Sequence, residues 1–289
     1  MTDRYAVIGN PIAQTKSPLL HAAFARQFGH DMTYEAILGP IGGFAEAVRA
    51  FRAAGGKGMN VTVPFKVEAL ELADRLTERA RLAQAVNTLK FDEEGILGEN
   101  TDGVGLVRDI QGRVGVALRG KRILLLGAGG AARGALLPLL AEQPSRLVIA
   151  NRTPAKAEAL RDRVAMHGDV AAGGFSDFAG EQFDVVINAT SASLSGADVP
   201  LPVGTYAAGS LAYDLVYGKG NTPFMSDALE NGAGQVADGL GILVAQAAEA
   251  FWLWRGVRPD VAPVIEMFRV ACSSDYARIS QTQHQVPCA

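Results

Sequence analysis

The sequence predicts an α/β protein with two domains, one built on a mixed sheet and the other on a doubly wound parallel sheet. The length of 289 residues fits about two domains, since one domain takes roughly 150 residues. Strand and helix patterns alternate along residues 1–102 and end in a hairpin, which is typical of mixed pairing. From Lys121 onward the alternation becomes a regular series of βαβ units, which indicates a parallel sheet.

Short apolar runs and helical repeats divide residues 1–102 into elements. Ser17 and Pro18 read as an N-cap and a first helical residue, and Leu20, Phe24 and Phe28 then share one helix face. We expect strands at 6–8, 33–37 and 59–63, a helix with Phe44, Val48 and Phe51 along its apolar stripe, a helix that carries Val67 and Leu70, and a hairpin of 85–89 with 96–97. Together these elements form the mixed-sheet domain.

The second domain is expected at 103–238. We expect its strands at 122–126, 146–150, near Val170, 184–188, 211–215 and at Val236, and its helices at 130–141, at 154–166 and from Thr222-Pro223 to Glu230. Two later helices, 240–254 and 259–270, have apolar faces that need a partner. Because domain termini are often close together, we expect 239–272 to complete the first domain. The polar stretch 273–289 has little periodicity and is predicted to be a flexible tail.

Composition excludes several classes of protein. With 27 Lys and Arg against 30 Asp and Glu, the net charge of −3 offers no basic field for nucleic acid. No window approaches the roughly 20 apolar residues of a membrane span, and the first residues do not resemble a signal peptide, so we expect a cytoplasmic protein. Two cysteines and four scattered histidines give no disulfide framework and no metal-ligand spacing.

A glycine-rich turn follows the strand 122–126. Gly127, Gly129 and Ala132 form GxGxxA between a buried strand and a helix, which is the context of the dinucleotide fingerprint. The first glycine allows the tight turn, the second lets backbone approach a pyrophosphate, and the helix N-terminus faces the anion. The pattern predicts a Rossmann domain that binds a dinucleotide.

The end of the next strand indicates which dinucleotide. An NAD enzyme normally has an acidic residue there for the ribose 2′-hydroxyl, but this sequence has Asn151, Arg152, Thr153 and, one turn later, Lys156. Arg152 can bind a 2′-phosphate through its planar fork and Lys156 adds a point charge, while Thr153 can cap the helix and donate a hydrogen bond. The cofactor is therefore predicted to be NADP.

Small neutral polar residues recur at strand ends of the first domain. They are Thr15 and Ser17, Asn60 and Thr62, Asn87 and Thr88, and Asn100 and Thr101, with the ionisable Lys66 and Asp102 among them. Such a set suits a polyhydroxylated ligand, and oxidation of a secondary alcohol needs a proton acceptor such as lysine or aspartate. Taken one by one, the same residues also fit helix caps, backbone partners and solvated charges, so the pattern leaves both interpretations open.

At these residues the sequence resembles the shikimate dehydrogenase family, over nearly the whole chain from Tyr5 to about Phe268. The matching motifs are GNPIAxTKSP from Gly9, GGKGMNVTVPFK from Gly55, AVNTL from Ala85, GENTDGVGL from Gly98, LLGAGGAARG from Leu125, NRT from Asn151, INAT from Ile187 and ADGLGILVAQAA from Ala237. The resemblance implies a substrate domain joined to an NADP-binding Rossmann domain. It implies reversible NADPH-dependent reduction of 3-dehydroshikimate to shikimate in aromatic amino-acid biosynthesis.

The resemblance also implies roles for individual residues. Lys66 and Asp102 match the catalytic pair, with Lys66 as proton donor and acceptor and Asp102 orienting it. Substrate contacts are implied for Thr15, Ser17, Asn60, Thr62, Asn87, Tyr217 and Gln246. Cofactor contacts are implied for Gly127, Gly129, Gly130, Ala131, Asn151, Arg152, Thr153, Lys156, Thr190, Leu215 and Gly239. The sequence departs from the family at Thr15, where serine is more frequent, and in the loop 192–195.

Three alternatives stay open. A quinate/shikimate dehydrogenase or an amino-shikimate homologue would share the fold, although Asn151-Arg152-Thr153 argues against an NAD-dependent variant. An adenosylmethionine-dependent methyltransferase would usually need an acid after the second strand, which is missing here. A non-catalytic NADP-binding regulator would be expected to lack Lys66 or Asp102, and both are present. The partners expected are the small-molecule substrate and the cofactor, with the protein a monomer or a homodimer.

Overall fold

The computed structural model describes residues 2–195, 199–218 and 220–269, which form two compact units. The first unit contains the described residues up to Val107 together with Arg133–Pro138 and Val244–Asp260. The second contains Arg108–Ala132, Leu139–Leu243 and the described residues from Val261 onward. The domain boundaries expected from the sequence stay a prediction, and the expected tail 273–289 lies outside the described residues.

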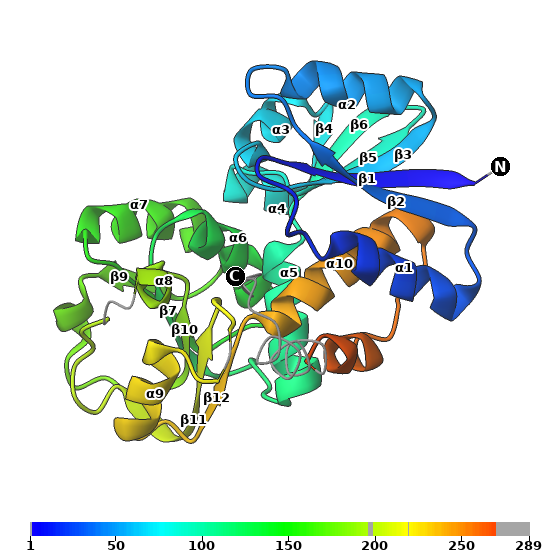
Figure 1. Ribbon diagram of the computed structural model, residues 1–289. Helices are drawn as coiled ribbons and strands as arrows, with labels where there is room; N and C mark the ends of the chain where they lie inside the picture. The colour runs from blue at the N-terminus through cyan, green and yellow to red at the C-terminus, as the bar shows by residue number, and fades with distance from the viewer. Residues whose placement is uncertain (1, 196–198, 219, 270–289) are drawn as a thin grey trace. The chain divides into compact units, whose positions relative to one another are not determined.

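The first unit is built on a mixed sheet of six strands (Figure 1). Its order is β2 (Met32–Leu38), β1 (Asp3–Gly9), β3 (Gly56–Val61), β5 (Thr88–Asp92), β6 (Gly95–Glu99) and β4 (Arg75–Leu76). Strand β1 runs parallel to both of its neighbours, whereas β5 is antiparallel to β3 and to β6. The expected strands 6–8 and 33–37 lie within β1 and β2, and the expected hairpin is present. The bounds expected for the third strand (59–63) and for the first strand of the hairpin (85–89) are wrong, because β3 ends at Val61 and β5 begins at Thr88.

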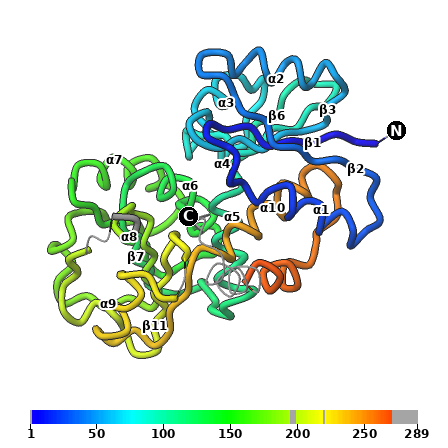
Figure 2. The backbone as a smooth tube through the Cα atoms, in the orientation of Figure 1, coloured from blue at the N-terminus to red at the C-terminus, as the bar shows by residue number. Residues whose placement is uncertain are grey.

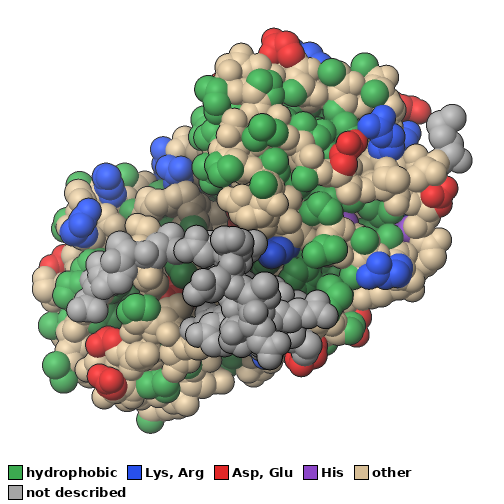
Figure 3. Space-filling view, in the orientation of Figure 1, with side chains coloured by type: hydrophobic (Ala, Val, Ile, Leu, Met, Phe, Trp, Pro, Cys, Tyr) green, Lys and Arg blue, Asp and Glu red, His purple; other side chains and the backbone are tan. Residues whose placement is uncertain are grey.

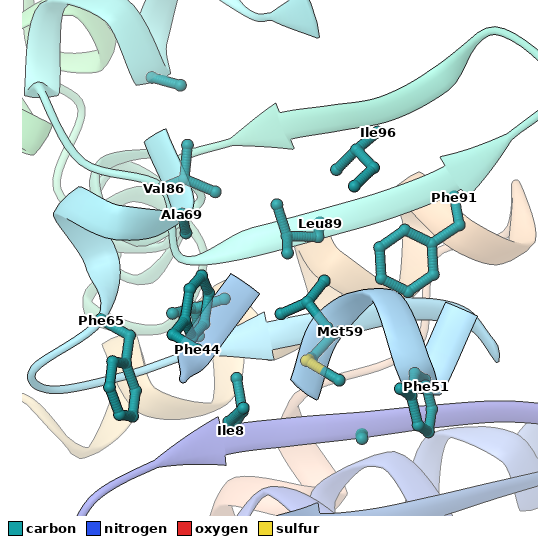
Figure 4. Packing of buried hydrophobic residues seen from close by; sticks show 14 residues of the cluster. Ile8, Phe44, Phe51, Met59, Phe65, Ala69, Val86, Leu89, Phe91 and Ile96 are labelled. Carbon is teal, nitrogen blue, oxygen red and sulfur yellow. The ribbon is translucent and has the colours of Figure 1, made fainter. Parts of the chain in front are cut away.

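Helices cover both faces of this sheet. They are α1 (Ser17–Phe28), α2 (Phe44–Ala53), α3 (Lys66–Leu72), α4 (Glu78–Ala83), α5 (Asp102–Arg108) and α10 (Leu240–Arg255). Phe44, Val48 and Phe51 of α2 are buried against Met59 and Leu89 of the sheet, as the helical spacing predicts (Figure 4). Helix α10 lies beside α1 (Figure 2). The Phe251 ring of α10 lies against the Phe24 and His21 rings of α1.

A further local expectation for this unit, the N-cap of α1, is also wrong. Lys16, not Ser17, is the N-cap of α1, and Ser17 is already helical with Pro18 behind it. Val67 and Leu70 lie on α3 as expected, where Val67 is 52% exposed and the buried residue is Ala69. A seven-residue helix makes fewer than two complete turns, so two apolar residues do not fix which face is buried.

The second unit is built on a parallel sheet of six strands, with helices along the chain between them. The strand order is β12 (Gln235–Ala237), β11 (Tyr206–Asp214), β10 (Phe183–Asn188), β7 (Arg122–Leu126), β8 (Arg146–Ala150) and β9 (Val170–Gly173). Every neighbouring pair is parallel. Numbered from β7, this is the Rossmann order 3-2-1-4-5-6, and its direction reverses between β7 and β10. The expected fold class is confirmed.

The helices of the second unit connect these strands. They are a π-helix (Asp109–Val114), α6 (Gly130–Ala141), α7 (Pro154–Val164), two 3₁₀ turns (Ala165–His167 and Phe175–Phe178), α8 (Ala192–Ser195) and α9 (Pro223–Glu230). Phe224, Met225 and Ala228 of α9 pack on one face of the sheet, against Leu124 and Val148 among others. Strand β11 is longer than expected at its start and ends one residue before Leu215. Residues 262–269 are helical, within the helix expected at 259–270.

The surface carries no block of one charge on the face shown in Figure 3, where acidic and basic side chains are scattered. None of the described helices has the length and apolar character needed to cross a bilayer. Within the described part of the chain, no three His, Cys, Asp or Glu side chains are grouped as metal ligands would be.

Candidate active site

An ion pair joins the two ionisable residues predicted for the first unit. Lys66 is the first residue of α3 and follows a tight turn in which the Phe65 amide donates to the Thr62 carbonyl, 3.0 Å away. Asp102 is the first residue of α5, directly after the loop that leaves β6. The Lys66 Nζ lies 2.7 Å from Asp102 Oδ2, with about one third of each side chain exposed (32% and 33%). A proton-transfer group is thus held in place and remains accessible.

Asn87 holds the other carboxylate oxygen of Asp102. Its Nδ2 donates to Asp102 Oδ1 at 2.7 Å and to Thr101 Oγ1 at 3.0 Å, and its Oδ1 accepts from the Thr101 amide at 2.9 Å. Asn87 is only 3% exposed. Both amide hydrogens therefore have partners within the protein, one of them the Asp102 carboxylate. A direct contact between Asn87 and a substrate stays a prediction.

The side-chain amide of Asn60, in β3, likewise forms hydrogen bonds within the protein. Its Nδ2 donates to the Asn87 carbonyl (3.3 Å) and to Thr88 Oγ1 (3.0 Å). Its Oδ1 accepts a 2.7 Å hydrogen bond from the Tyr34 hydroxyl. With both hydrogens used, Asn60 can only accept a hydrogen bond from a ligand hydroxyl, through the remaining lone pair of Oδ1.

Tyr34 is a member of this network that the sequence did not reveal. Its ring stacks on the imidazole of His21, with centroids 4.2 Å apart and planes 6° from parallel. His21 is completely buried, and burial lowers the pKa of its imidazole to about 3, so the ring is neutral. Burial likewise raises the pKa of the Tyr34 hydroxyl, and a hydrogen bond with Ser17 opposes that rise. An uncharged aromatic stack therefore supports the Asn60 amide.

Thr15 and Ser17 form a pair beside α1. The Thr15 hydroxyl donates to Ser17 Oγ at 3.2 Å, and Thr15 Oγ1 accepts from the Ser17 amide at 3.3 Å. Two hydroxyl groups are thus placed on one turn. Gln246 of α10 lies against α5, since a Cβ on Gly105 would come within 2.7 Å of the Gln246 amide nitrogen.

A buried ion pair supports the end of β6, just before Asp102. Arg79 donates through Nε and Nη2 to the two carboxylate oxygens of Glu99 at 3.1 and 2.5 Å, and the Glu99 side chain is 4% exposed. Glu99 Oε1 also accepts from the Asn100 amide at 2.7 Å, and Asn100 Oδ1 accepts from the Asp102 amide at 3.2 Å. These contacts fix the backbone that carries Asp102, and the family motif around Glu99 was the only sequence signal for them.

The glycine-rich turn of the second unit has the form that the fingerprint requires. Gly127 has φ +105°, its amide donates to the Ala150 carbonyl at 2.8 Å, and a Cβ there would come within 3.1 Å of the Ala189 carbonyl oxygen. A Cβ on Gly129 would have no described atom within 4 Å. Gly130 and Ala131 then begin α6. The turn can accept a pyrophosphate against backbone amides, at the point where the strand order reverses.

Cationic side chains follow the next strand. Arg152 and Lys156 are exposed, and neither side chain has a hydrogen bond or ion pair to another described residue. The Asn151 amide group donates to the Thr153 carbonyl at 2.9 Å. Thr153 occupies the expected N-cap position of α7, although its side chain accepts no capping hydrogen bond. The two cations and the Thr153 hydroxyl can therefore bind a phosphate.

The other residues predicted for the cofactor lie near the ends of β10 and β11. The Thr190 hydroxyl donates to Asn188 Oδ1 at 2.7 Å, and its methyl carbon would be 3.2 Å from a Cβ on Gly127. Gly239 lies against Leu215, because a Cβ there would be 2.0 Å from the Leu215 carbonyl oxygen. Tyr217 is 38% exposed in the segment after β11. Thr190 thus lies beside the glycine turn, and Leu215 lies beside Gly239.

Comparison with known proteins identifies the family. The description "Shikimate dehydrogenase substrate binding domain" matches residues 7–89, "Shikimate / quinate 5-dehydrogenase" matches 109–195, and "Shikimate 5'-dehydrogenase C-terminal domain" matches 239–266. A protein of Nitrosospira multiformis named "Shikimate dehydrogenase (NADP(+))" is 59% identical over 95% of this chain and 100% of its own. The chain belongs to the shikimate dehydrogenase family.

Solved structures of this family and of a related reductase share the fold. An Ael1 enzyme from Pseudomonas putida is 54% identical with TM-score 0.88, over 92% of this chain and 98% of its own. Shikimate 5-dehydrogenase from Thermus thermophilus, solved in complex with NADP(H) and shikimate, is 32% identical with TM-score 0.80, over 93% and 100%. A 5-ketofructose reductase of Gluconobacter is 28% identical with TM-score 0.82, over 94% and 99%.

Proposed function

We propose that this chain catalyses the reversible NADP-dependent oxidation of shikimate to 3-dehydroshikimate, with Lys66 and Asp102 at the reacting hydroxyl. The observation that carries the proposal is the 2.7 Å ion pair between these side chains, braced by Asn87. The family relatives support the choice of substrate and cofactor, since the Nitrosospira multiformis protein is named an NADP-dependent shikimate dehydrogenase. The reductive direction would serve aromatic amino-acid biosynthesis.

Oxidation of a secondary alcohol removes a hydride from carbon and a proton from oxygen. When bound, NADP supplies the hydride acceptor. The protein itself must accept the proton, and the uncharged Lys66 Nζ takes it from the substrate hydroxyl. In the reductive direction the Lys66 ammonium returns a proton to the oxygen while the carbonyl carbon receives the hydride. Asp102 keeps Nζ within reach and accepts a hydrogen bond from a substrate hydroxyl.

The remaining polar residues of the first unit would orient the substrate. Thr15 and Ser17 would bind the carboxylate through their hydroxyl groups, and Asn60 would accept a hydrogen bond from a ring hydroxyl through Oδ1. Thr62, Tyr217 and Gln246 are proposed as further substrate contacts. Asn87, whose amide hydrogens are both used, would act through Asp102.

The residues of the second unit have the chemical groups that binding of NADP requires. Gly127, Gly129, Gly130 and Ala131 would hold the pyrophosphate. Arg152, Lys156, Thr153 and Asn151 would bind the adenosine 2′-phosphate, because exposed cations suit a dianion and no acidic residue is present there to repel it. Thr190, Leu215 and Gly239 would lie at the ribose and nicotinamide.

A single assay tests the proposal. Purified protein receives shikimate and NADP, and reduction is followed by the nicotinamide absorbance. Quinate, and 5-ketofructose with NADPH, serve as competing substrates, and Lys57→Ala serves as a control because Lys57 is an exposed lysine of the same unit. We expect reduction of NADP with shikimate, unchanged in the control. Cofactor binding without reduction would favour a non-catalytic regulator, and a preference for quinate would favour a quinate/shikimate dehydrogenase.

We further propose that the protein acts in the cytoplasm, as a monomer or a homodimer. NADPH-dependent biosynthesis takes place where the cofactor is regenerated, which supports the location. Cell fractionation tests it, and light scattering on the eluted peak of a sizing column tests the oligomeric state. Recovery in a membrane fraction, or a mass above that of a dimer, would contradict these two proposals.

A further inference from the structure

A buried carboxylate in the second unit collects four hydrogen bonds. Asp214 is the last residue of β11 and has no exposed surface. Its Oδ1 accepts from Asn188 Nδ2 at 3.2 Å and from the Val216 amide at 3.1 Å. Its Oδ2 accepts from the hydroxyl groups of Ser193 and Thr222, each at 2.6 Å. Within the described residues no cation pairs with Asp214, so neutral donors alone compensate its burial.

The four donors come from segments that are separate in the sequence. Asn188 ends β10, Ser193 lies in α8, Val216 follows β11, and Thr222 is the N-cap of α9, where it also accepts from the Met225 amide at 3.2 Å. Asn188 extends the network, because its Oδ1 accepts from the Thr190 amide and hydroxyl at 3.1 and 2.7 Å. One carboxylate therefore joins the segments 188–193 and 214–216 to Thr222 at the start of α9.

These segments lie beside the dinucleotide turn. The methyl carbon of Thr190 would be 3.2 Å from a Cβ on Gly127, and the strand order reverses between β7 and β10. In open α/β sheets, ligands bind beyond the carboxyl ends of the strands at such a reversal. Arg152 and Lys156 follow β8, one strand away from β7 on the side opposite to β10.

We infer that Asp214 is a positioning residue that holds residues 188–193 and 214–216, together with Thr222, in the arrangement that binds the nicotinamide group of the cofactor. The inference rests on the proposed function, which supplies NADP as the ligand. Asp214 suits this task because a carboxylate only accepts hydrogen bonds, and all four neighbours donate. Asparagine has the same shape, but its amide group would face two donors and leave them without an acceptor.

The test compares two ligands that differ only in the nicotinamide group. Binding of NADP and of 2′-phospho-ADP-ribose, which lacks nicotinamide, is measured by calorimetry without substrate for the unchanged protein, Asp214→Asn and Asp184→Asn. Asp184 is the matched control, because it accepts from the Arg122 amide at 2.8 Å near the opposite end of β10. Hydrogen bonds to a charged group contribute about 1.5–3 kcal/mol, which is about ten- to hundredfold in affinity.

For Asp214→Asn we expect NADP to bind about tenfold more weakly and 2′-phospho-ADP-ribose to bind within about twofold of the unchanged protein. The kcat with shikimate should fall as well, while Asp184→Asn keeps both affinities. Equal weakening of both ligands would show a merely structural role, and unchanged NADP affinity with unchanged kcat would also overturn the inference.

Ser193→Ala gives a second variant if Asp214→Asn does not fold, since it removes one donor and leaves the carboxylate in place. We expect the same selective loss, about threefold. Failure of the proposed function is seen separately: the unchanged protein would then bind NADP without reducing it in the presence of shikimate. The comparison of the two ligands needs no turnover and would still report on Asp214.

Discussion

The two units differ in whether the polar groups of their candidate sites are already hydrogen-bonded within the protein. In the first unit Lys66, Asp102, Asn87 and Asn60 are bonded to one another, so most donors and acceptors are already used. In the second unit, Arg152 and Lys156 are exposed and have no hydrogen bond or ion pair to another described residue. Orienting a neutral hydroxyl for proton transfer requires fixed geometry, whereas a phosphate can be bound by accessible charges.

The comparison predicts that substitutions in the first unit affect turnover and that those around Arg152 affect cofactor affinity. A hydrogen-bonded network transmits the loss of one member to the others, because each orients the next. The Arg152 and Lys156 side chains have no hydrogen-bond partners among the described residues through which such a loss could spread. The experiments that follow test this difference, beginning with the largest expected effect.

Lys66→Ala should lower kcat by roughly 10²- to 10⁴-fold, the usual contribution of a positioned acid–base group. Substrate affinity should change much less, because other residues bind the carboxylate and the ring hydroxyl groups. Steady-state kinetics with shikimate and NADP measures both quantities, with Lys57→Ala as the exposed-lysine control. A rise in KM with kcat unchanged would make Lys66 a binding residue.

Asn87→Ala should lower kcat by about 10²-fold, because a displacement of about 1 Å in a reacting group costs that much. The substitution leaves Asp102 Oδ1 without its 2.7 Å donor and frees the carboxylate to rotate away from Lys66. Affinity for the cofactor, measured by calorimetry, should stay unchanged. A change confined to the KM for shikimate would instead make Asn87 a direct substrate ligand.

His21→Phe tests the aromatic stack below Asn60 through the pH dependence of stability. Burial lowers the pKa of His21 to about 3 in the folded protein, whereas the unfolded chain takes up the proton below about 6.5. Because only the unfolded state is protonated between these values, stability falls as the pH decreases from about 7 toward 3. At about pH 5 this difference amounts to about 2 kcal/mol.

The free energy of unfolding is therefore measured by urea titration at about pH 7 and pH 5 for both proteins. Phenylalanine keeps a flat ring at this position and cannot titrate, so the loss on acidification should be smaller by about 2 kcal/mol. His30→Phe, a partly exposed histidine of the same unit, is the control. An identical loss in the His21→Phe protein and the unchanged protein would show that His21 takes up a proton in the folded state.

Arg152→Ala should weaken NADP binding about tenfold and leave NAD binding nearly unchanged, because only NADP presents a phosphate to the guanidinium. Both affinities are measured by calorimetry. Arg161→Ala is the matched control, since Arg161 lies in α7, the helix that begins shortly after Arg152, and pairs with Asp162 at 2.8 Å. Equal weakening of NADP and NAD would place the 2′-phosphate elsewhere.

The sequence predicted the second unit more completely than the first. Strands 122–126 and 146–150 and helix 130–141 match β7, β8 and α6 residue for residue. Buried parallel strands appear as continuous apolar runs between glycine and polar turns, which makes their ends easy to recognise. The two-residue β4 and the six-residue α4 were not predicted, because elements this short carry no periodicity.

The residues of the candidate site were likewise predicted from the sequence only in part. Family motifs pointed to Lys66, Asp102, Asn60 and Asn87, but they did not show that the Asn87 amide is used by Asp102 and Thr101. Tyr34 gave no sequence signal, since a tyrosine within a strand is most often a packing residue. Which hydrogen bonds form depends on the register of β3 against β5, and that register is set by the whole sheet.

The smallest expected effect concerns the carboxylate end of the first unit's site. Shikimate carries its carboxylate on a planar alkene carbon, whereas quinate has a tetrahedral carbon there with an additional hydroxyl. A pocket that must admit this hydroxyl needs both space and a hydrogen-bond partner. Sterics alone reject an extra hydroxyl weakly, by about 10²-fold at most.

Thr15→Ser should keep activity with shikimate and relax the discrimination against quinate by about threefold. Serine retains the hydroxyl that donates to Ser17 Oγ at 3.2 Å and removes only a methyl group, so the carboxylate contact survives while the pocket gains room. The ratio of kcat/KM for shikimate and quinate measures the effect in both proteins, with Thr33→Ser, an exposed strand residue, as control. Comparable kcat/KM for the two acids in the unchanged protein would contradict the proposed preference, because Thr15 would then exclude nothing.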